Sequence, residues 1–222
     1  QDYLINQIKS MLDKYIKLDD KINYNKSDIE YLTHHIKWLE QLPQPEQRSE
    51  EWYEFRKNRL TASDLLGALD KKSSKYTELL LKKCYDKNTN FPMGEAILHG
   101  IKFEPVATSI YEKRYNLQII EFGCLPHNTI DYFGASPDGI VSYDSENKNY
   151  VGRMLEIKCP KSRKITGIIP EGYYAQIQGQ LEVCDLEYCD FLECDFQMYN
   201  SCEEFYNDTL ENNKLLNKKK YE

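Results

Sequence analysis

The sequence predicts a mixed fold of the α/β or α+β class, with helices packed on the faces of a central β-sheet. Three features support this class. Apolar residues recur at helical spacing over roughly the first half of the chain, β-rich segments separated by turns follow, and a helix and a last strand come after them. This succession of helices, a three-stranded meander, a helix and a strand is typical of a sheet covered by helices.

The chain is long enough for one good-sized domain with an appendage, because it has 222 residues and 41% hydrophobic content. We expect a helical hairpin over residues 1–45 and the main domain over residues 46–222. The second helix of the hairpin is predicted to begin at a capping box of Ser27 and Glu30. Its apolar stripe consists of Ile29, Leu32, Ile36 and Leu39. We interpret the hairpin as a packing appendage; a partner-binding or DNA-facing module is the alternative.

Further helical segments are expected before the β-rich region. They span residues 49–60, a short stretch that starts at 61–64, residues 77–84 and residues 94–115. Thr61 and Asp64 suit the cap of the short helix. Gly100 and Pro105 are the points at which the longest helix is expected to break.

The second half of the chain is predicted to hold the sheet. Strands are expected within residues 117–124, 132–142 and 151–159, with a polar turn at 144–149. A helix over 172–183, a strand over 188–196 and a Lys-rich closing helix over 205–221 follow. Tyr174, Ile177 and Leu181 are expected to form the apolar side of the helix over 172–183.

Composition limits the possible functions. The formal net charge of -7 argues against a general nucleic-acid coat protein, but not against an enzyme that holds nucleic acid in one local groove. No apolar run approaches a membrane span, and no charged-then-apolar leader opens the chain. Seven Cys without a secretory signal favour a reducing intracellular compartment. The late cysteines lack a C-x-x-C pair, so we expect small core or surface thiols rather than a metal or iron–sulfur site.

One strand carries acid and base side by side. Side chains alternate between the two faces of a strand, so Glu156 and Lys158 point to the face opposite Leu155 and Ile157. Asp138 opens the preceding strand and is expected to meet Glu156 across one ladder. Carboxylates that hold a hard cation, with an ammonium group beside them, supply what phosphodiester cleavage needs. Taken singly, each of these residues also fits a turn or a solvated strand face.

Several segments together resemble a known family. They are Arg56 with Thr61-Ala62-Ser63, Gly100 with Glu104, Ser136-Pro137-Asp138-Gly139, Leu155-Glu156-Ile157-Lys158-Cys159-Pro160 and Tyr174-Ala175-Gln176-Ile177-Gln178. In this order they resemble the phage lambda exonuclease and YqaJ-like viral recombinase branch of the PD-(D/E)XK nucleases. The resemblance covers roughly Arg48 to Phe196 and implies a restriction-endonuclease-like core. It does not cover the N-terminal hairpin.

The resemblance implies a double-strand DNA exonuclease that digests from the 5′ end and leaves single-stranded 3′ tails for recombination. It implies Mg²⁺ or Mn²⁺ held by Asp138, Glu156, the Ile157 carbonyl and Glu104. Lys158 would serve the attacking water, and Gln176 would support the site from its helix.

Other residues are expected to contact the DNA. Arg56 and Ser63 match residues that grip the terminal 5′ phosphate in the family. The guanidinium of arginine can donate two parallel hydrogen bonds to a phosphate. Ser63 lies in the first turn of a predicted helix, where free N–H groups favour an anion. Arg59 follows Arg56 at the end of the same helix. Lys161 and Arg163 belong to a short basic patch that either contacts the DNA backbone or is a solvated loop.

Other functions stay open at this point. The chain could be a non-catalytic DNA-end-binding module on the same fold, a restriction-type endonuclease or a CRISPR-associated iron–sulfur nuclease. By analogy with the family, a homo-oligomeric ring and a single-strand annealing protein are the expected partners. If the protein is viral, the host cytoplasm or nucleus is its expected location.

Overall fold

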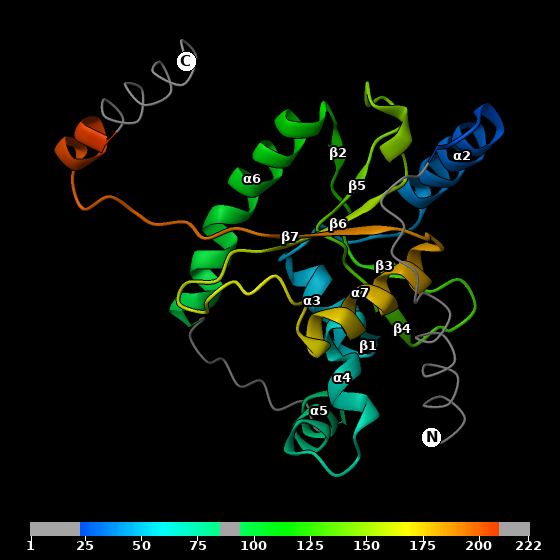
Figure 1. The fold of residues 1–222 in the computed structure, drawn as a ribbon. Helices are drawn as coiled ribbons and strands as arrows, with labels where there is room; N and C mark the ends of the chain where they lie inside the picture. The colour runs from blue at the N-terminus through cyan, green and yellow to red at the C-terminus, as the bar shows by residue number, and fades with distance from the viewer. Residues whose placement is uncertain (1–22, 85–93, 209–222) are drawn as a thin grey trace.

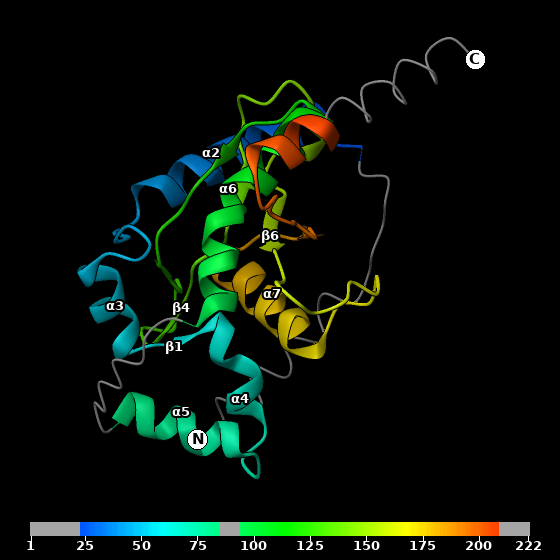
Figure 2. The ribbon, with the colours of Figure 1, turned by 90° about the vertical axis from the view of Figure 1, so that its left-hand side faces the viewer.

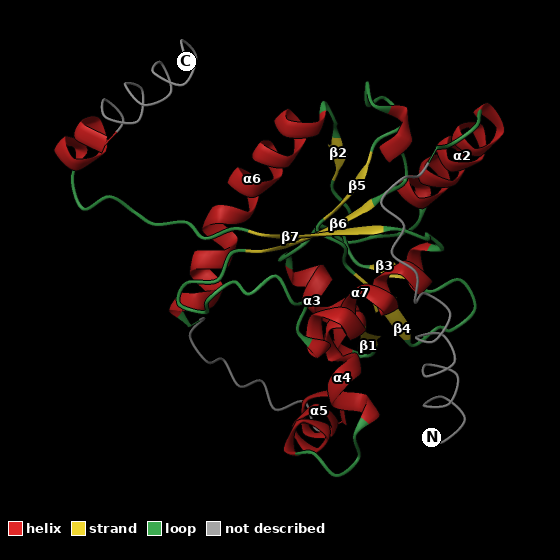
Figure 3. Ribbon diagram, viewed as in Figure 1, coloured by secondary structure: helices red, strands yellow, loops and turns green. Residues whose placement is uncertain are grey.

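A computed structural model describes residues 23–84 and 94–208, so the predicted first helix falls almost entirely outside the described residues, as does most of the predicted closing helix. Strands gather in the middle of the molecule, with helices around them (Figure 3). The predicted mixed class is confirmed. No helix in the described ranges is both long enough and apolar enough to cross a membrane.

The larger sheet has the strand order β2-β5-β6-β7. Its strands are β2 (Ile119–Ile120), β5 (Gly139–Val141), β6 (Met154–Lys158) and β7 (Cys189–Glu193). β5 is antiparallel to both β2 and β6, whereas β7 is parallel to β6 and follows it after a helix. This is the predicted meander, helix and strand. The strands are shorter than the predicted segments; only Ile119 and Ile120 of residues 117–124 pair with β5.

A smaller sheet divides one predicted strand in two. It has the order β1-β4-β3, with β1 (Leu60–Thr61) parallel to β4 (Phe133–Ala135) and β3 (Leu125–Pro126) antiparallel to it. The segment predicted as a single strand over 132–142 therefore contributes β4 to one sheet and β5 to the other. Pro137 lies between them and has no N–H for a ladder. Asp138 thus stands where the chain passes between sheets.

Six α-helices and two 3₁₀ turns surround the strands in the described residues, and residues 202–208, after the last strand, are also helical. The six helices and two turns are α2 (Lys26–Gln41), α3 (Glu50–Lys57), η1 (Ala62–Asp64), α4 (Leu65–Leu69), α5 (Ser74–Cys84), α6 (Glu95–Tyr115), η2 (Lys148–Tyr150) and α7 (Glu171–Cys184). α4 and α5 lie together at the end of the molecule away from α2 (Figures 1 and 2).

The long helix α6 is continuous, so the expected break near Gly100 and Pro105 was wrong. Proline removes one intrahelical hydrogen bond, and glycine weakens a helix. The C-terminal half of α6 is nevertheless held by packing, because Ala107 and Tyr111 are buried in a cluster with Leu155 and Ile157 of β6. Tertiary contacts therefore outweigh local propensity along this helix.

Two predicted helix caps also differ in the structure. The capping box of α2 is formed by Asn25 and Asp28, two residues before the expected Ser27 and Glu30, because each of these side chains accepts from the backbone N–H of the other. Thr61 and Asp64 stand at the N-cap positions of the 3₁₀ turn over 62–64 and of the following helix, but neither side chain makes a capping bond, because the Thr61 hydroxyl donates to the Asp64 carboxylate instead.

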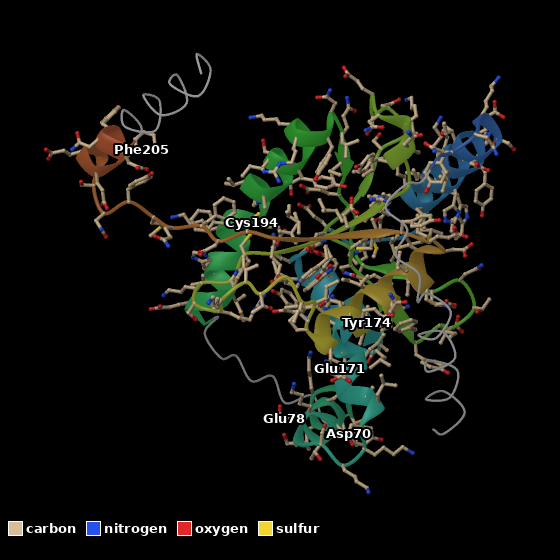
Figure 4. The ribbon with its side chains drawn as sticks, viewed as in Figure 1. Asp70, Glu78, Glu171, Tyr174, Cys194 and Phe205 are labelled. Carbon is tan, nitrogen blue, oxygen red and sulfur yellow. The ribbon has the colours of Figure 1, made fainter. Side chains whose placement is uncertain are left out.

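Helix α7 is buried on more sides than an amphipathic pattern predicts. Tyr174, expected on its apolar side, is 38% exposed (Figure 4). Gln180, which is not among the residues of the predicted apolar side, is 1% exposed. The reason is that α7 lies between the two sheets: Gly179 lies so close to Leu65 and Phe133 that it leaves no room for a side chain, and Gln180 faces the larger sheet.

Helix α2 packs into the principal core. Ile36 and Leu39 are fully buried in the same cluster as Leu125 and Leu181, and Leu32 packs against that cluster. The predicted apolar stripe of this helix is therefore the surface by which it attaches to the sheets.

We predict that Leu39→Ala lowers the free energy of unfolding by about 2–5 kcal/mol, because it removes fully buried atoms and leaves a cavity. His34→Ala, on the exposed side of α2, is the matched control and should change stability by less than about 0.5 kcal/mol. Urea unfolding measures both. Equal stability of the two variants would mean that α2 adds nothing to the core.

Candidate active site

The candidate site begins where β5 and β6 pair. The register Gly139↔Leu155 brings Asp138, just before β5, opposite Glu156 in β6. The Asp138 Oδ2 atom accepts a hydrogen bond from the Ile157 backbone N–H at 2.7 Å. The two carboxylates that the sequence predicts to converge across one ladder are therefore brought together.

Glu156 is fully buried, so the interpretation of its strand face as solvated is wrong. Its Oε1 atom accepts from the Lys158 ammonium group and, at 2.6 Å, from the Gln176 amide. Its Oε2 atom accepts from the Gln180 amide at 2.8 Å. Lys158 on the strand and Gln176 on α7, both predicted to belong to the site, therefore bind this carboxylate. Helix α7 covers the face of the strand on which Glu156 lies.

The charges of the site do not balance. Burial raises the pKa of Asp138 well above its usual range, and the nearby Glu156 carboxylate adds to this, while the Lys158 ammonium and the Ile157 N–H oppose it. Burial alone lowers the pKa of Lys158, but Glu156 and Asp138 outweigh it and the pKa is raised. Lys158 is therefore a cation, and when both carboxylates are ionised one ammonium group leaves an excess of negative charge, which adds to the effect of burial in raising the pKa of Asp138.

This donor set fits a hard divalent cation. Mg²⁺ and Mn²⁺ take oxygen ligands, and Mg²⁺ usually needs only one or two carboxylates from the protein. Asp138 and Glu156 supply two, and their excess negative charge is what such an ion offsets. Within residues 23–84 and 94–208, no three Asp, Glu, His or Cys side chains gather into a complete ion-binding cluster.

Glu104, the third predicted carboxylate, is held elsewhere in the site. It projects from α6 and accepts two hydrogen bonds from the Arg48 guanidinium, at 2.9 and 3.0 Å. Arg48 has a left-handed backbone conformation, with φ of 71°, which is uncommon for a residue with a side chain. Sequence reasoning missed Arg48, because no local motif indicates a pair 56 residues apart.

Arg56 and Ser63, the predicted phosphate grip, lie together. The Arg56 guanidinium stacks over the Trp52 ring, 4.0 Å from its centroid, and donates to the Ser63 hydroxyl at 3.3 Å and to Thr61 at 3.5 Å. Burial lowers the pKa of Arg56, which means that its charge is poorly compensated. Hydroxyls around an under-compensated guanidinium form a suitable pocket for an anion.

Ser136 joins this anion pocket to the carboxylates. Its hydroxyl accepts from the Trp52 indole at 3.1 Å and from Arg56 at 3.3 Å, and its carbonyl accepts from the Gln180 amide at 3.1 Å. Ser136 stands two residues before Asp138. The sequence indicates no separate role for Ser136, although it belongs to the Ser136-Pro137-Asp138-Gly139 motif, which was the available signal.

These groups line one cavity of about 380 Å³. Its walls include the carboxylates of Glu104 and Asp138, the cations Arg48 and Arg56, and the polar side chains Ser63, Ser136, Gln176 and Gln180. The cavity therefore places an anion pocket beside Asp138, while Glu156 is fully buried and does not line the cavity.

Three predicted DNA contacts lie outside the cavity. Arg59 folds back on Phe55, with its guanidinium 3.7 Å from the ring centroid. Lys161 pairs with Glu95 at the start of α6, and Arg163 pairs with Glu193 at the end of β7. Lys161 and Arg163 line a neighbouring groove, whereas Arg59 lines neither hollow.

Most of the residues that form this site fall within a match to one protein family. Residues 51–187 match the model of the YqaJ-like viral recombinase domain, which is more than half of the chain. The chain belongs to this family. The YqaJ-like match begins in α3 and ends just before β7, so it contains both the carboxylate pair and the anion pocket.

Known proteins agree with the YqaJ-like assignment. The chain is 36% identical over 182 residues to the uncharacterized protein R354 of Acanthamoeba polyphaga mimivirus, covering 77% of this chain and 33% of that protein. It thus spans a third of this relative. The alkaline exonuclease LHK-Exo of Laribacter hongkongensis, alone and in complex with dAMP, is similar with a TM-score of 0.55 and 28% identity, over 68% of this chain and 77% of that one. Over the matched length, the chain is therefore similar in fold to an alkaline exonuclease.

The seven cysteines all lie in the described residues, and none of them forms a disulfide. Cys124, Cys159 and Cys184 are buried, and Cys194 packs against the cluster around Ala107 of α6 (Figure 4). No three cysteines gather in the described ranges, so an iron–sulfur cluster has no support there.

We predict that Gln180→Leu lowers the free energy of unfolding by about 1–3 kcal/mol, because it removes the donor to the buried Glu156 carboxylate and the Ser136 carbonyl. Gln178→Leu is the matched control on the same helix. Gln178 is also buried, and the amide oxygens of both residues lack a hydrogen-bond partner among the described residues, but only Gln180 donates to the Glu156 carboxylate and the Ser136 carbonyl, so Gln178→Leu should be neutral or stabilising. Chemical denaturation compares the two; a larger loss for Gln178→Leu would contradict this assignment.

Proposed function

We propose that the protein is a metal-dependent DNA exonuclease that digests linear double-stranded DNA from the 5′ end and leaves 3′ single-stranded tails for recombination or repair. One observation carries the proposal: the Asp138 and Glu156 carboxylates, with Lys158, converge across one strand ladder beside the Arg56 anion pocket. Family membership and the likeness to an alkaline exonuclease support the same reaction class.

In this proposal, Asp138 and Glu156 hold Mg²⁺ or Mn²⁺, with the Ile157 carbonyl and Glu104 completing the ligand set. Such an ion, when bound, activates water and neutralises charge on the phosphate. Glu104 joins the set only after it leaves Arg48, to which both of its oxygens are bonded. Arg48 is then free to pair with a phosphate of the DNA instead.

Lys158 orients the attacking water and offsets the charge that develops on the scissile phosphate. It is suited to this because its ammonium group is fixed by Glu156 and stays protonated. Gln176 acts through Glu156: its amide fixes the carboxylate from α7 and leaves the second oxygen to Gln180. Gln176 is thus a positioning residue.

The anion pocket gives the proposed enzyme its end preference. Arg56 and Ser63 would bind the terminal 5′ phosphate, which carries more charge than an internal phosphodiester. Ser136 holds Arg56 and lies two residues from Asp138, so the pocket stands at a fixed short distance along the chain from the carboxylates. This arrangement favours an exonuclease over an endonuclease or a non-catalytic end-binding module, since it joins an end-recognition pocket to an intact set of carboxylates and a lysine.

The remaining expectations depend on the resemblance and stay predictions. They are a homo-oligomeric ring, a single-strand annealing partner, action inside the host cell and a domain boundary near residue 45.

The Lys158→Ala variant should lose at least about 10²-fold in the rate of Mg²⁺-dependent digestion of end-labelled linear duplex, because it removes the cation that serves water and phosphate. EDTA should abolish digestion by the parental protein. Lys164→Ala, at an exposed position of the following basic loop, is the matched control and should digest normally. Digestion by Lys158→Ala at the parental rate would refute the assigned site.

The Arg56→Ala variant should lose the preference for 5′-phosphorylated over 5′-hydroxyl ends, because the guanidinium is the charged group of the anion pocket. The measurement is the initial rate on two otherwise identical linear duplexes, with closed circular DNA as a third substrate that should resist digestion. Arg59→Ala, whose side chain stacks on Phe55 outside the cavity, should keep the preference. Equal parental rates on both ends would count against the pocket.

A further inference from the structure

A second groove, of about 520 Å³, runs beside the catalytic cavity. One wall is the first turns of α6, including Ala96 and Gly100, and the other is the segment from Ile157 to Arg163. Ile97, Ile101 and Glu104 line both hollows and form the ridge between them. The groove and the cavity are therefore two arms that meet at the carboxylate site.

The wall after β6 carries three cations, each paired with a carboxylate: Lys158 with Glu156, Lys161 with Glu95 and Arg163 with Glu193. It presents Lys158, Lys161 and Arg163, and Lys158 and Arg163 lie 5.1 and 5.7 Å from the centroid of the Tyr173 ring. Lys161 reaches across the groove to Glu95, but 83% of the Glu95 side chain is exposed. Exposed pairs of this kind contribute little, so a phosphate can replace Glu95 as the partner of Lys161.

The opposite wall contains a glycine that the fold does not require. Gly100 is inside α6, where glycine weakens a helix relative to alanine. A Cβ built on Gly100 would meet nothing within 4 Å. The contrast is Gly179 of α7, whose Cβ would lie 2.3 Å from Leu65. Close packing therefore explains why position 179 is a glycine. At position 100 no neighbour requires a glycine, and the space that a side chain would occupy is part of the groove.

The geometry points to this groove as the track of the cleaved DNA strand on the 3′ side of the scissile phosphate, with Gly100 at the point of closest approach. This inference rests on the proposed function. The strand enters between Gly100 and Lys161, passes Lys158 and Glu104, and ends with its 5′-terminal nucleotide in the cavity beside Arg56. Gly100 is thus a positioning residue, because its lack of a side chain lets the sugar-phosphate backbone lie directly against α6.

The test compares stability with binding in Gly100→Ala. Thermal unfolding should shift upward by about 2–4 °C, since alanine favours the helix and meets no neighbour. The dissociation constant for a fluorescently labelled 5′-phosphorylated duplex, measured by anisotropy in Ca²⁺ without Mg²⁺, should rise at least about tenfold because the methyl group occupies the track. Gly100→Leu should weaken binding further. The affinity for dAMP should not change in either variant, because in this proposal a single nucleotide would fill only the cavity.

Ser109→Ala is the matched control, because it also increases helix propensity in α6 but lies outside both hollows. It should be stabilised slightly and bind duplex normally. Unchanged duplex affinity in Gly100→Ala and Gly100→Leu would overturn the strand track and leave the proposed function standing. If the parental protein bound neither duplex nor dAMP, the proposed function would fail instead.

Lys161→Gln tests the other wall. The slope of log affinity against log salt concentration should decrease by about 0.9, the value for one phosphate contact on duplex DNA. An unchanged slope would place the phosphates elsewhere and overturn the track.

Discussion

The burial of the Glu156 carboxylate constrains the rest of the structure. An ionised carboxylate removed from water costs several kcal/mol unless donors and cations compensate it. Lys158 provides the cation, and the amides of Gln176 and Gln180 provide the remaining donors. Both amides come from α7, so α7 must lie directly on β6. Gly179 permits this helix to touch Leu65 on its other side, which brings the segment carrying Ser63 toward the carboxylates.

The passage of the chain between the two sheets completes the site. β4 belongs to the small sheet with β1, and β5 belongs to the large sheet with β6. The three residues between β4 and β5 have separate tasks: the Ser136 hydroxyl holds Arg56, Pro137 ends the ladder, and Asp138 faces Glu156. The anion pocket and the carboxylate pair are therefore connected by two peptide units, and a shift of one moves the other. Gln180 reinforces this connection by donating to both Ser136 and Glu156.

Local patterns were sufficient to predict the central part of the site. Strand periodicity placed Glu156 and Lys158 on one face, and the turn before β5 placed Asp138 opposite them. Contacts between distant segments were not predictable in this way. Nothing near Arg48 indicates that it holds Glu104, and the burial of Gln180 depends on where α7 packs. The predicted break in α6 was wrong for the same reason. Pro105 favours a break locally, but the burial of Ala107 and Tyr111 outweighs this local preference.

The Arg48–Glu104 pair shows how the free protein tolerates an acidic site. The pair is partly exposed, with 41% and 28% of the two side chains accessible, so little free energy is needed to separate it. Yet Arg48 keeps an uncommon backbone conformation. A guanidinium held over the third carboxylate offsets negative charge near Asp138, whose raised pKa reflects its carboxylate neighbours as well as burial. In the proposed function a divalent ion would offset that charge, and Arg48 would then have no further electrostatic reason to stay. A weak pair in a constrained position is therefore better suited to exchange with DNA phosphate than a strong buried one.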